Sequence, residues 1–250
     1  MKNRLRLALI LIVLSSLTMM KFTSTEAAPP NTIEGNIDDV ARAILTYFPK
    51  VDGEIVALRE NQVEVELGKQ LGLASGILLT VYREDKPFFH PVTGVPLGRF
   101  EDELGIVEVI RLERPHLLAE FIGPTKRIQK GDRVRLPATR IPMAVSMTSD
   151  KGHAFLMNEL VAALNETGRF NIVTLPPGSQ LEAARSGGNR YFIPLEIGRE
   201  EGRFSMLLTI KNTYSAKSIA EIHVIINQSE ESDLILEHLQ YQLFEQRQNN

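Results

Sequence analysis

The side chains that could do acid–base, nucleophilic or metal chemistry are scattered along this sequence. No two of its histidines stand at the short spacings that place two metal ligands on one helix or hairpin. The sequence also lacks cysteine, a Gly-x-Ser-x-Gly elbow and any spacing that nominates a Ser–His–Asp set. We therefore expect no catalytic residue, no metal ligand and no cofactor, with a metal site assembled from distant residues as the alternative. The histidines are His90, His116, His153, His223 and His238.

One candidate binding site lies between a predicted strand and a predicted helix. The tetrapeptide Ser-Asp-Lys-Gly at 149–152 precedes a helix expected over 153–165, and backbone N–H groups at a helix start favour an anion. Lys151 and Gly152, joined by Arg185 from a later turn, are the candidate ligands of a small anion. In the alternative interpretation, the serine or aspartate of the tetrapeptide caps the helix. The sequence lacks the glycine-rich motifs of nucleotide sites.

A second candidate site is the segment 87–98, which is rich in turn formers and too dense in proline for a central strand. It predicts a protruding loop or hairpin that carries Phe88, Phe89 and His90. Exposed aromatic side chains there would bind a protein partner; in the alternative, both rings fold back over the neighbouring strands. Because adjacent side chains of an extended segment point in opposite directions, we expect one ring packed and the other exposed.

A run of short strands must position this segment. Apolar and polar residues alternate along 62–67, and 77–83 is apolar at nearly every position, which is typical of a strand covered on both faces. Short strands with close turns are typical of a small β-barrel-like module, here over 51–136. Its predicted strands are 53–59, 62–67, 77–83, 104–114, 117–122 and 132–136.

A helix is expected just ahead of this module, within 28–50. Asn36 is a good N-cap with Asp39 three residues later, an apolar stripe follows, and Pro49 ends the helix. We expect the helix to cover an open face of the module, and the residues before it, 28–33, to form a polar leader.

The second half of the chain predicts a different architecture. After a proline-containing linker at 137–142, residues 143–246 read as a small α/β domain with a mixed sheet and two or three helices, followed by a tail at 247–250. The fold class is therefore α+β. Its predicted strands are 142–147, 170–174, 191–197, 203–211 and 218–226. Its predicted helices are 153–165, a short helix with a capping box at Ser179 and Glu182, and 230–246.

The first residues predict export. Lys2, Arg4 and Arg6 precede an apolar run over 7–14, and small residues around Ala27 fit a cleavage site, so 1–27 is interpreted as a signal peptide. An uncleaved membrane anchor is the alternative. Export predicts a periplasmic protein, at most peripheral to the outer membrane. The net charge of −3, spread along the chain, argues against nucleic acid as a partner.

Two resemblances to known families agree with this division. The stretch Gly72-Leu73-Ala74-Ser75-Gly76 and its neighbours resemble the C-terminal domain of the flagellar assembly protein T (FlgT) family. The helix and strand over 160–173 are similar to the small α/β domains of TolB N-terminal and CsgG-like envelope proteins. FlgT-type proteins place the α/β domain first, so the order here is reversed. The stretches that carry the first resemblance are 53–56, 63–68, 72–76, 81–83, 91–98, 104–109 and 128–134.

These observations lead to a functional hypothesis. The resemblances imply an exported, non-enzymatic bacterial cell-envelope protein that acts as an assembly or scaffolding module through protein–protein contacts, with a flagellar or outer-membrane complex, or a homo-oligomer, as its setting. The alternative is a periplasmic binding protein for a small anionic ligand. A third reading, an exported hydrolase, would need a catalytic pair that the spacing of residues does not reveal.

Overall fold

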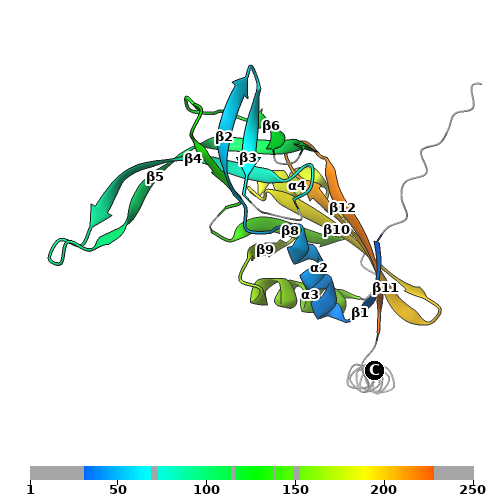
Figure 1. The fold of residues 1–250 in the computed structure, drawn as a ribbon. Helices are drawn as coiled ribbons and strands as arrows, with labels where there is room; N and C mark the ends of the chain where they lie inside the picture. Colours follow the sequence, from blue (N-terminus) through cyan, green and yellow to red (C-terminus); the bar gives the residue numbers. More distant parts are fainter. Residues whose placement is uncertain (1–30, 69–72, 114–115, 138, 149–152, 228–250) are drawn as a thin grey trace, which may run out of the picture.

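A closed ring of strands and an open sheet pack against each other, and a long hairpin projects from the ring (Figure 1). The computed structural model describes residues 31–68, 73–113, 116–137, 139–148 and 153–227. The expected signal peptide, Lys151 and Gly152, and the helix expected over 230–246 lie outside these residues. The predicted α+β class is confirmed.

Six antiparallel strands form the ring in the order β2-β3-β6-β5-β4-β7, with β7 returning to β2. Alternation decides which side chains face its interior, where Val63, Val65 and Val107 are fully buried. The apolar run at the start of β4 is covered on both faces, as predicted, because the sheet lies against its outer side. The strands are β2 (Asp52–Arg59), β3 (Gln62–Leu67), β4 (Leu78–Phe89), β5 (Pro96–Glu113), β6 (His116–Ile122) and β7 (Arg133–Arg135).

The second unit is a six-stranded mixed sheet in the order β1-β12-β11-β10-β8-β9. Its parallel pairs are β1 with β12, β8 with β10 and β8 with β9, while β10, β11 and β12 are antiparallel. The predicted order strand, helix, strand, helix, then three strands is confirmed. The elements are β1 (Asn31–Gly35), β8 (Ile141–Met147), α3 (Ala154–Glu166), β9 (Phe170–Thr174), α4 (Leu181–Ser186), β10 (Tyr191–Glu200), β11 (Arg203–Asn212) and β12 (Ser218–Ile226).

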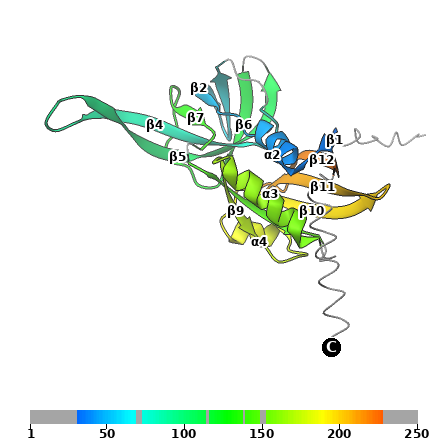
Figure 2. The ribbon, with the colours of Figure 1, turned by 90° about the horizontal axis from the view of Figure 1, so that it is seen from below.

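The N-terminal helix, α2 (Ile37–Thr46), belongs to the sheet and not to the ring. Its predicted capping box is confirmed, because Asp39 N donates to Asn36 Oδ1 at 3.0 Å and Asn36 N donates to Asp39 Oδ2 at 2.9 Å. The prediction that it covers an open face of the module is wrong, since the ring closes on itself and α2 lies beside α3 (Figure 2). The predicted leader also overlaps β1, which pairs with β12.

One hydrophobic core runs through both units. Phe48, just after α2, packs edge-on against Phe170 at 5.3 Å and against Tyr191 at 4.9 Å between ring centroids. The Tyr191 hydroxyl accepts the Leu78 N–H at 2.8 Å, which ties β10 to β4. The segment predicted as a linker includes Ile141 at the start of β8. The ring and the sheet therefore share a packed joint.

Helix α4 begins differently from the prediction. Its N-cap residue is Gln180, whose side chain makes no capping hydrogen bond, so the capping box predicted at Ser179 is wrong. The Ser179 hydroxyl donates instead to the Pro176 carbonyl at 2.6 Å and closes the turn before the helix.

Candidate functional site: a projecting hairpin

The hairpin of β4 and β5 continues well beyond the ring. Among the described strands, β4 pairs with β7 only over Thr80–Tyr82 and β5 pairs with β6 only from Ile106 on. Residues 84–101, here called the arm, therefore form a two-stranded ribbon (Figures 1 and 2). At about 3.3 Å per residue, its strands carry the connecting turn roughly 20 Å away from the ring.

Proline is tolerated in this ribbon because neither of its edges carries a further strand among the described residues. Pro87 in β4 and Pro96 in β5 lack an N–H, and an outward-facing position needs none. Register shifts accompany them, between Glu84 and Pro87 and between Phe88 and Phe89. The strands were predicted to end at 83 and to resume at 104, and these boundaries are wrong for this reason.

Four backbone N–H groups of the turn at the end of the arm find acceptors within the turn. His90 N donates to Val95 O at 2.8 Å, and Gly94 N donates to His90 O at 2.9 Å. The amides of Val92 and Thr93 donate to His90 Nδ1 at 3.3 and 3.2 Å. Gly94 has φ of +67°, which suits glycine at this position of the turn. The histidine is thus the internal acceptor that closes the turn.

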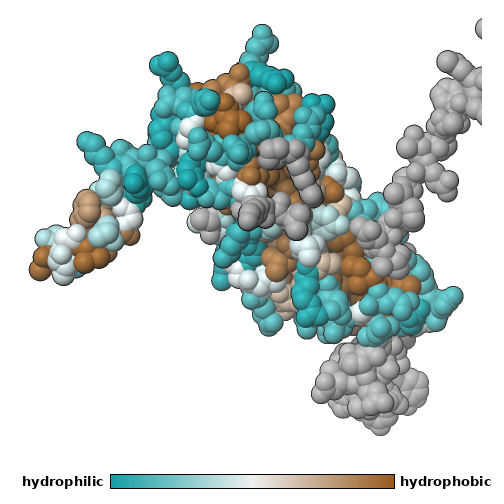
Figure 3. Space-filling view, in the orientation of Figure 1, coloured by the Kyte–Doolittle hydropathy of each residue, from teal (hydrophilic) through white to brown (hydrophobic). Residues whose placement is uncertain are grey.

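The end of the arm is apolar and exposed. Of the nine large apolar side chains that are exposed in the described part of the chain, five lie on the arm. Val92, at the turn, is 87% exposed, Phe100 62% and Phe89 55%. Figure 3 shows this end as apolar and the root of the arm as polar. We call these residues the apolar tip: Phe89, Val92, Val95, Leu97 and Phe100.

The two adjacent phenylalanines have different surroundings. Phe89 points outward, whereas Phe88 stacks at a tilt on Phe100, with 4.9 Å between ring centroids. The alternative in which both rings fold back over the neighbouring strands is wrong, because Phe88 packs on Phe100 within the arm and Phe89 is exposed. Phe88 lies opposite Gly98 and Phe89 opposite Pro96, with a register shift between the two pairs. The half-buried Phe88 and the exposed Phe89 therefore lie side by side at the end of the arm.

Ion pairs link the root of the arm to other parts of the chain. Glu101 accepts two hydrogen bonds from Arg135 of β7, at 2.8 and 2.5 Å. Asp102 pairs with Lys126, and Glu103 lies 3.9 Å from Arg190. The hydrogen bonds from Arg135 lower the pKa of Glu101. We call these three pairs the collar; they connect the root of the arm to β7, to Lys126 and to Arg190 beside β10.

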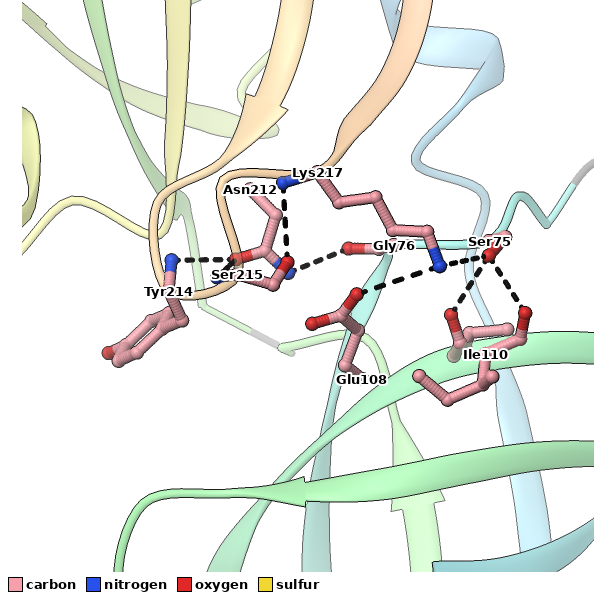
Figure 4. A network of polar contacts seen from close by, with 9 residues as sticks. Ser75, Gly76, Glu108, Ile110, Asn212, Tyr214, Ser215 and Lys217 are labelled. Atoms are coloured by element: carbon pink, nitrogen blue, oxygen red, sulfur yellow. Dashed lines mark hydrogen bonds and ion pairs between the residues drawn. The ribbon is translucent and has the colours of Figure 1, made fainter.

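A polar network joins the ring to the sheet below the arm (Figure 4). Lys217 Nζ donates to Ser75 Oγ at 2.9 Å and lies 4.0 Å from Glu108 Oε1. Asn212 Nδ2 donates to the Gly76 carbonyl at 2.9 Å. Glu108 is 3% exposed, and burial raises its pKa. Because Glu108 lies on β5, the strand that forms the arm is anchored to the sheet.

Arg185 was predicted to bind an anion together with Lys151 and Gly152, which lie outside the described residues. In the structure, Arg185 holds a turn. Its Nε donates to the Thr213 carbonyl at 2.6 Å, and its Nη2 donates to the Tyr214 carbonyl at 3.2 Å. It also pairs with Glu182 at 3.0 Å. The guanidinium therefore holds the turn between β11 and β12.

A pocket of about 220 Å³ lies near the carboxyl end of β8. Met147, Leu181 and Phe192 supply apolar walls, and Lys211 is the charged residue of the lining. The Thr148 hydroxyl in the wall already donates to the Leu195 carbonyl at 3.0 Å. Arg185 does not belong to the lining, so the predicted anion ligands do not converge there.

The other polar residues form no further metal-binding cluster in the described part of the chain. No group of three or more His, Asp or Glu side chains in it could hold a metal ion. None of its helices has the length and apolar character needed to cross a bilayer. His153 packs edge-on against Phe204 at 5.4 Å, and His223 Nε2 lies 2.9 Å from Glu200 Oε1.

No protein-family model matches this chain, and no curated protein sequence is significantly similar to it. Among the similar solved structures is the LpoB C-terminal domain from Salmonella enterica. It is 11% identical, with a TM-score of 0.30, over 36% of this chain and 86% of that chain. A likeness of this size transfers neither fold nor function.

Proposed function

We propose that this chain is an exported, non-enzymatic cell-envelope protein that works as an assembly or scaffolding module by docking its arm into a protein partner. The observation that carries the proposal is the apolar tip, where five large apolar side chains are exposed together at the end of the arm. Exposed apolar groups gathered on one projection favour an interaction site, whereas single exposed ones are ordinary.

Side chains, and not backbone pairing, make the proposed contact. Strand addition needs a free edge with unhindered N–H and C=O groups. The arm carries Pro87 and Pro96, and charged side chains at 84–86 and Arg99. Prolines and charges are the means by which natural sheets protect their edges. The ribbon is therefore suited to present its tip while its edges stay unpaired.

The form of the tip favours a socket over a flat partner surface. Phe100 stacks on Phe88, Phe89 is exposed beside them, and Val92 lies at the end of the turn. Burying these exposed side chains together requires a partner that encloses the turn. Aromatic anchors in enclosed pockets supply a large share of binding energy in protein interfaces.

The collar contributes by orienting the arm before it binds. Each of Glu101, Asp102 and Glu103 pairs with a lysine or arginine side chain from outside the arm. An element that is ordered before binding loses less conformational entropy on association. A fixed arm on a rigid body is what a scaffolding role requires.

Site-specific photocrosslinking in the cells of origin tests this proposal. A photoreactive amino acid replaces Val92 of the full chain, and a matched control replaces the exposed Glu196 of β10. We expect a discrete protein adduct from position 92 that position 196 does not give. Adducts with lipid alone would assign the tip to a membrane surface. Absence of adducts, or identical adducts from both positions, would overturn the proposal.

Export is tested separately. If the signal peptide 1–27 is cleaved, the mature chain begins at Ala28. Mass spectrometry of the purified chain measures whether it does. Recovery of the full-length chain in the cytoplasmic fraction would contradict an envelope role.

A further inference from the structure

We propose that His90 is a pH-sensitive latch that sets the conformation of the apolar tip. When neutral, its ring closes the turn; when protonated, it releases the two amides at the end of the arm. As a regulator of docking, the latch rests on the function proposed above. As a property of the turn, it is measurable in the free protein.

The geometry fixes the protonation state of the closed turn. Val92 N and Thr93 N both donate to His90 Nδ1, at 3.3 and 3.2 Å. A ring nitrogen that accepts an N–H cannot carry a proton of its own. The closed turn therefore requires a neutral imidazole with its hydrogen on Nε2.

Protonation removes this acceptor. An imidazolium presents N–H groups at both nitrogens, so the amides of Val92 and Thr93 would face a donor. The turn keeps its other two bonds, from His90 N to Val95 O and from Gly94 N to His90 O. The opening is thus confined to the two residues at the apex. Val92 belongs to the apolar tip, so its displacement alters the docking surface.

Charged residues lie near the turn, but none of those described pairs with the imidazole of His90. The charged residues of the arm are Glu84, Asp85, Lys86, Arg99 and Glu101. Within the described residues, Glu84 pairs with Arg99, Glu101 pairs with Arg135, and no ion pair involves His90. Histidine is the side chain whose ordinary charge change falls between about pH 5 and 8.

Two variants separate the latch from a merely structural role. His90→Asp supplies a short acceptor for the amides two and three residues ahead, as in an Asx-turn, and stays ionised over this pH range. His90→Phe keeps a planar ring but removes the acceptor at every pH. Neither change touches a residue of the core.

Nuclear magnetic resonance of the full-length chain between pH 5 and 8 tests the latch. We expect the ring nitrogen shifts to show the Nε2–H form at pH 8, and the amide shifts of Val92 and Thr93 to titrate together with the ring. The amide of Gly94 serves as the internal control. His90→Asp should hold the two amides in the bonded state throughout, and His90→Phe in the open state. The latch would be overturned by a ring that carries its hydrogen on Nδ1 at pH 8. It would also be overturned if the amide shifts of Val92 and Thr93 stayed constant while the ring shifts changed with pH.

The two proposals fail in distinguishable ways. If docking uses the closed turn, the photocrosslink from position 92 should fall about tenfold on acidification, the effect of losing roughly one net hydrogen bond. The His90→Asp chain should keep its crosslink. If the amides of Val92 and Thr93 respond to pH but position 92 gives no crosslink, the latch is supported and the docking role is contradicted. If position 92 gives a crosslink but the amides do not respond to pH, docking is supported and the latch is contradicted.

Discussion

Phe89 and Phe88 are neighbours with different expected roles. Phe89→Ala should leave stability unchanged within about 0.5 kcal/mol, since the side chain is exposed, and should weaken the crosslink from position 92 at least tenfold. Phe88→Ala loses its stacking on Phe100, an effect confined to the arm. We therefore expect neither variant to lower Tm by more than a few degrees. A large fall in Tm for Phe89→Ala would show that the ring is part of the core.

Tyr191 offers a test of the joint between ring and sheet. Tyr191→Phe leaves the Leu78 N–H without its acceptor in a buried position, which should cost about 1–3 kcal/mol of unfolding free energy. Tyr214→Phe, at an exposed position, is the matched control and should cost almost nothing. Urea denaturation of the two variants measures the difference. Equal stabilities would mean that the hydrogen bond is dispensable.

Glu108 gives stability a pH dependence of predictable sign. Burial raises the pKa of Glu108, so the folded state holds this proton more tightly than the unfolded state does. Its contribution is most favourable below the unfolded pKa of about 4.3 and is lost as pH rises through the folded pKa. Glu108→Gln should therefore be more stable than the wild type at pH values above the folded pKa of Glu108. Below the unfolded pKa the two proteins should be similarly stable. The opposite order in urea denaturation at pH 8 would show that the Lys217 ion pair dominates.

At the scale of single elements, the sequence predicted strand centres better than strand ends. Alternation in 62–67 and a continuous apolar run in 77–83 were sufficient to place β3 and the inner part of β4. The outer parts of β4 and β5 were missed because proline density excludes a central strand and says nothing against a free ribbon. The arm was foreseen as a protruding loop or hairpin that carries Phe88, Phe89 and His90. The role of His90 Nδ1 as a backbone acceptor depends on turn geometry that the sequence does not specify.

Helix α2 illustrates a second limit. Its capping box and apolar stripe were readable from Asn36, Asp39 and the residues that follow. A stripe shows that one face is buried but not which element buries it. Strand β1 was missed for a related reason, because its partner β12 lies at the other end of the described chain. Such long-range pairing leaves no local pattern.

The collar should govern how narrowly the arm is oriented. Glu101→Gln removes the charge from the bidentate contact with Arg135, with little effect on stability because exposed pairs contribute about 0–1 kcal/mol. Spin labels at Val92→Cys and Glu196→Cys in this cysteine-free chain report the distance from arm to sheet. We expect a broader distance distribution in Glu101→Gln. Arg99→Gln, which breaks a pair within the arm, is the control and should leave the distribution unchanged.

At the scale of the whole molecule, the shared core predicts cooperative unfolding. The proline-containing segment at 137–142 suggested two domains with a linker. Ring residues such as Leu79 nevertheless share one hydrophobic core with sheet residues, and the Leu78 N–H donates to the Tyr191 hydroxyl across the joint. We expect one calorimetric transition whose van 't Hoff and calorimetric enthalpies agree. Two resolved transitions would mean that the ring and the sheet fold independently. No sequence pattern could have revealed this joint, because contacts such as Asn212 with Gly76 join residues far apart in the chain.

Strand β5 gives the arm a mechanical property. It is one continuous strand from Pro96, beside the turn, to Glu113 in the ring, and its inner part runs alongside β6. A pull along the arm would load the hydrogen bonds between β5 and β6 in shear, so that several must break together and none can be unzipped singly. A partner that holds the tip could thus transmit tension into the body of the protein without unravelling it.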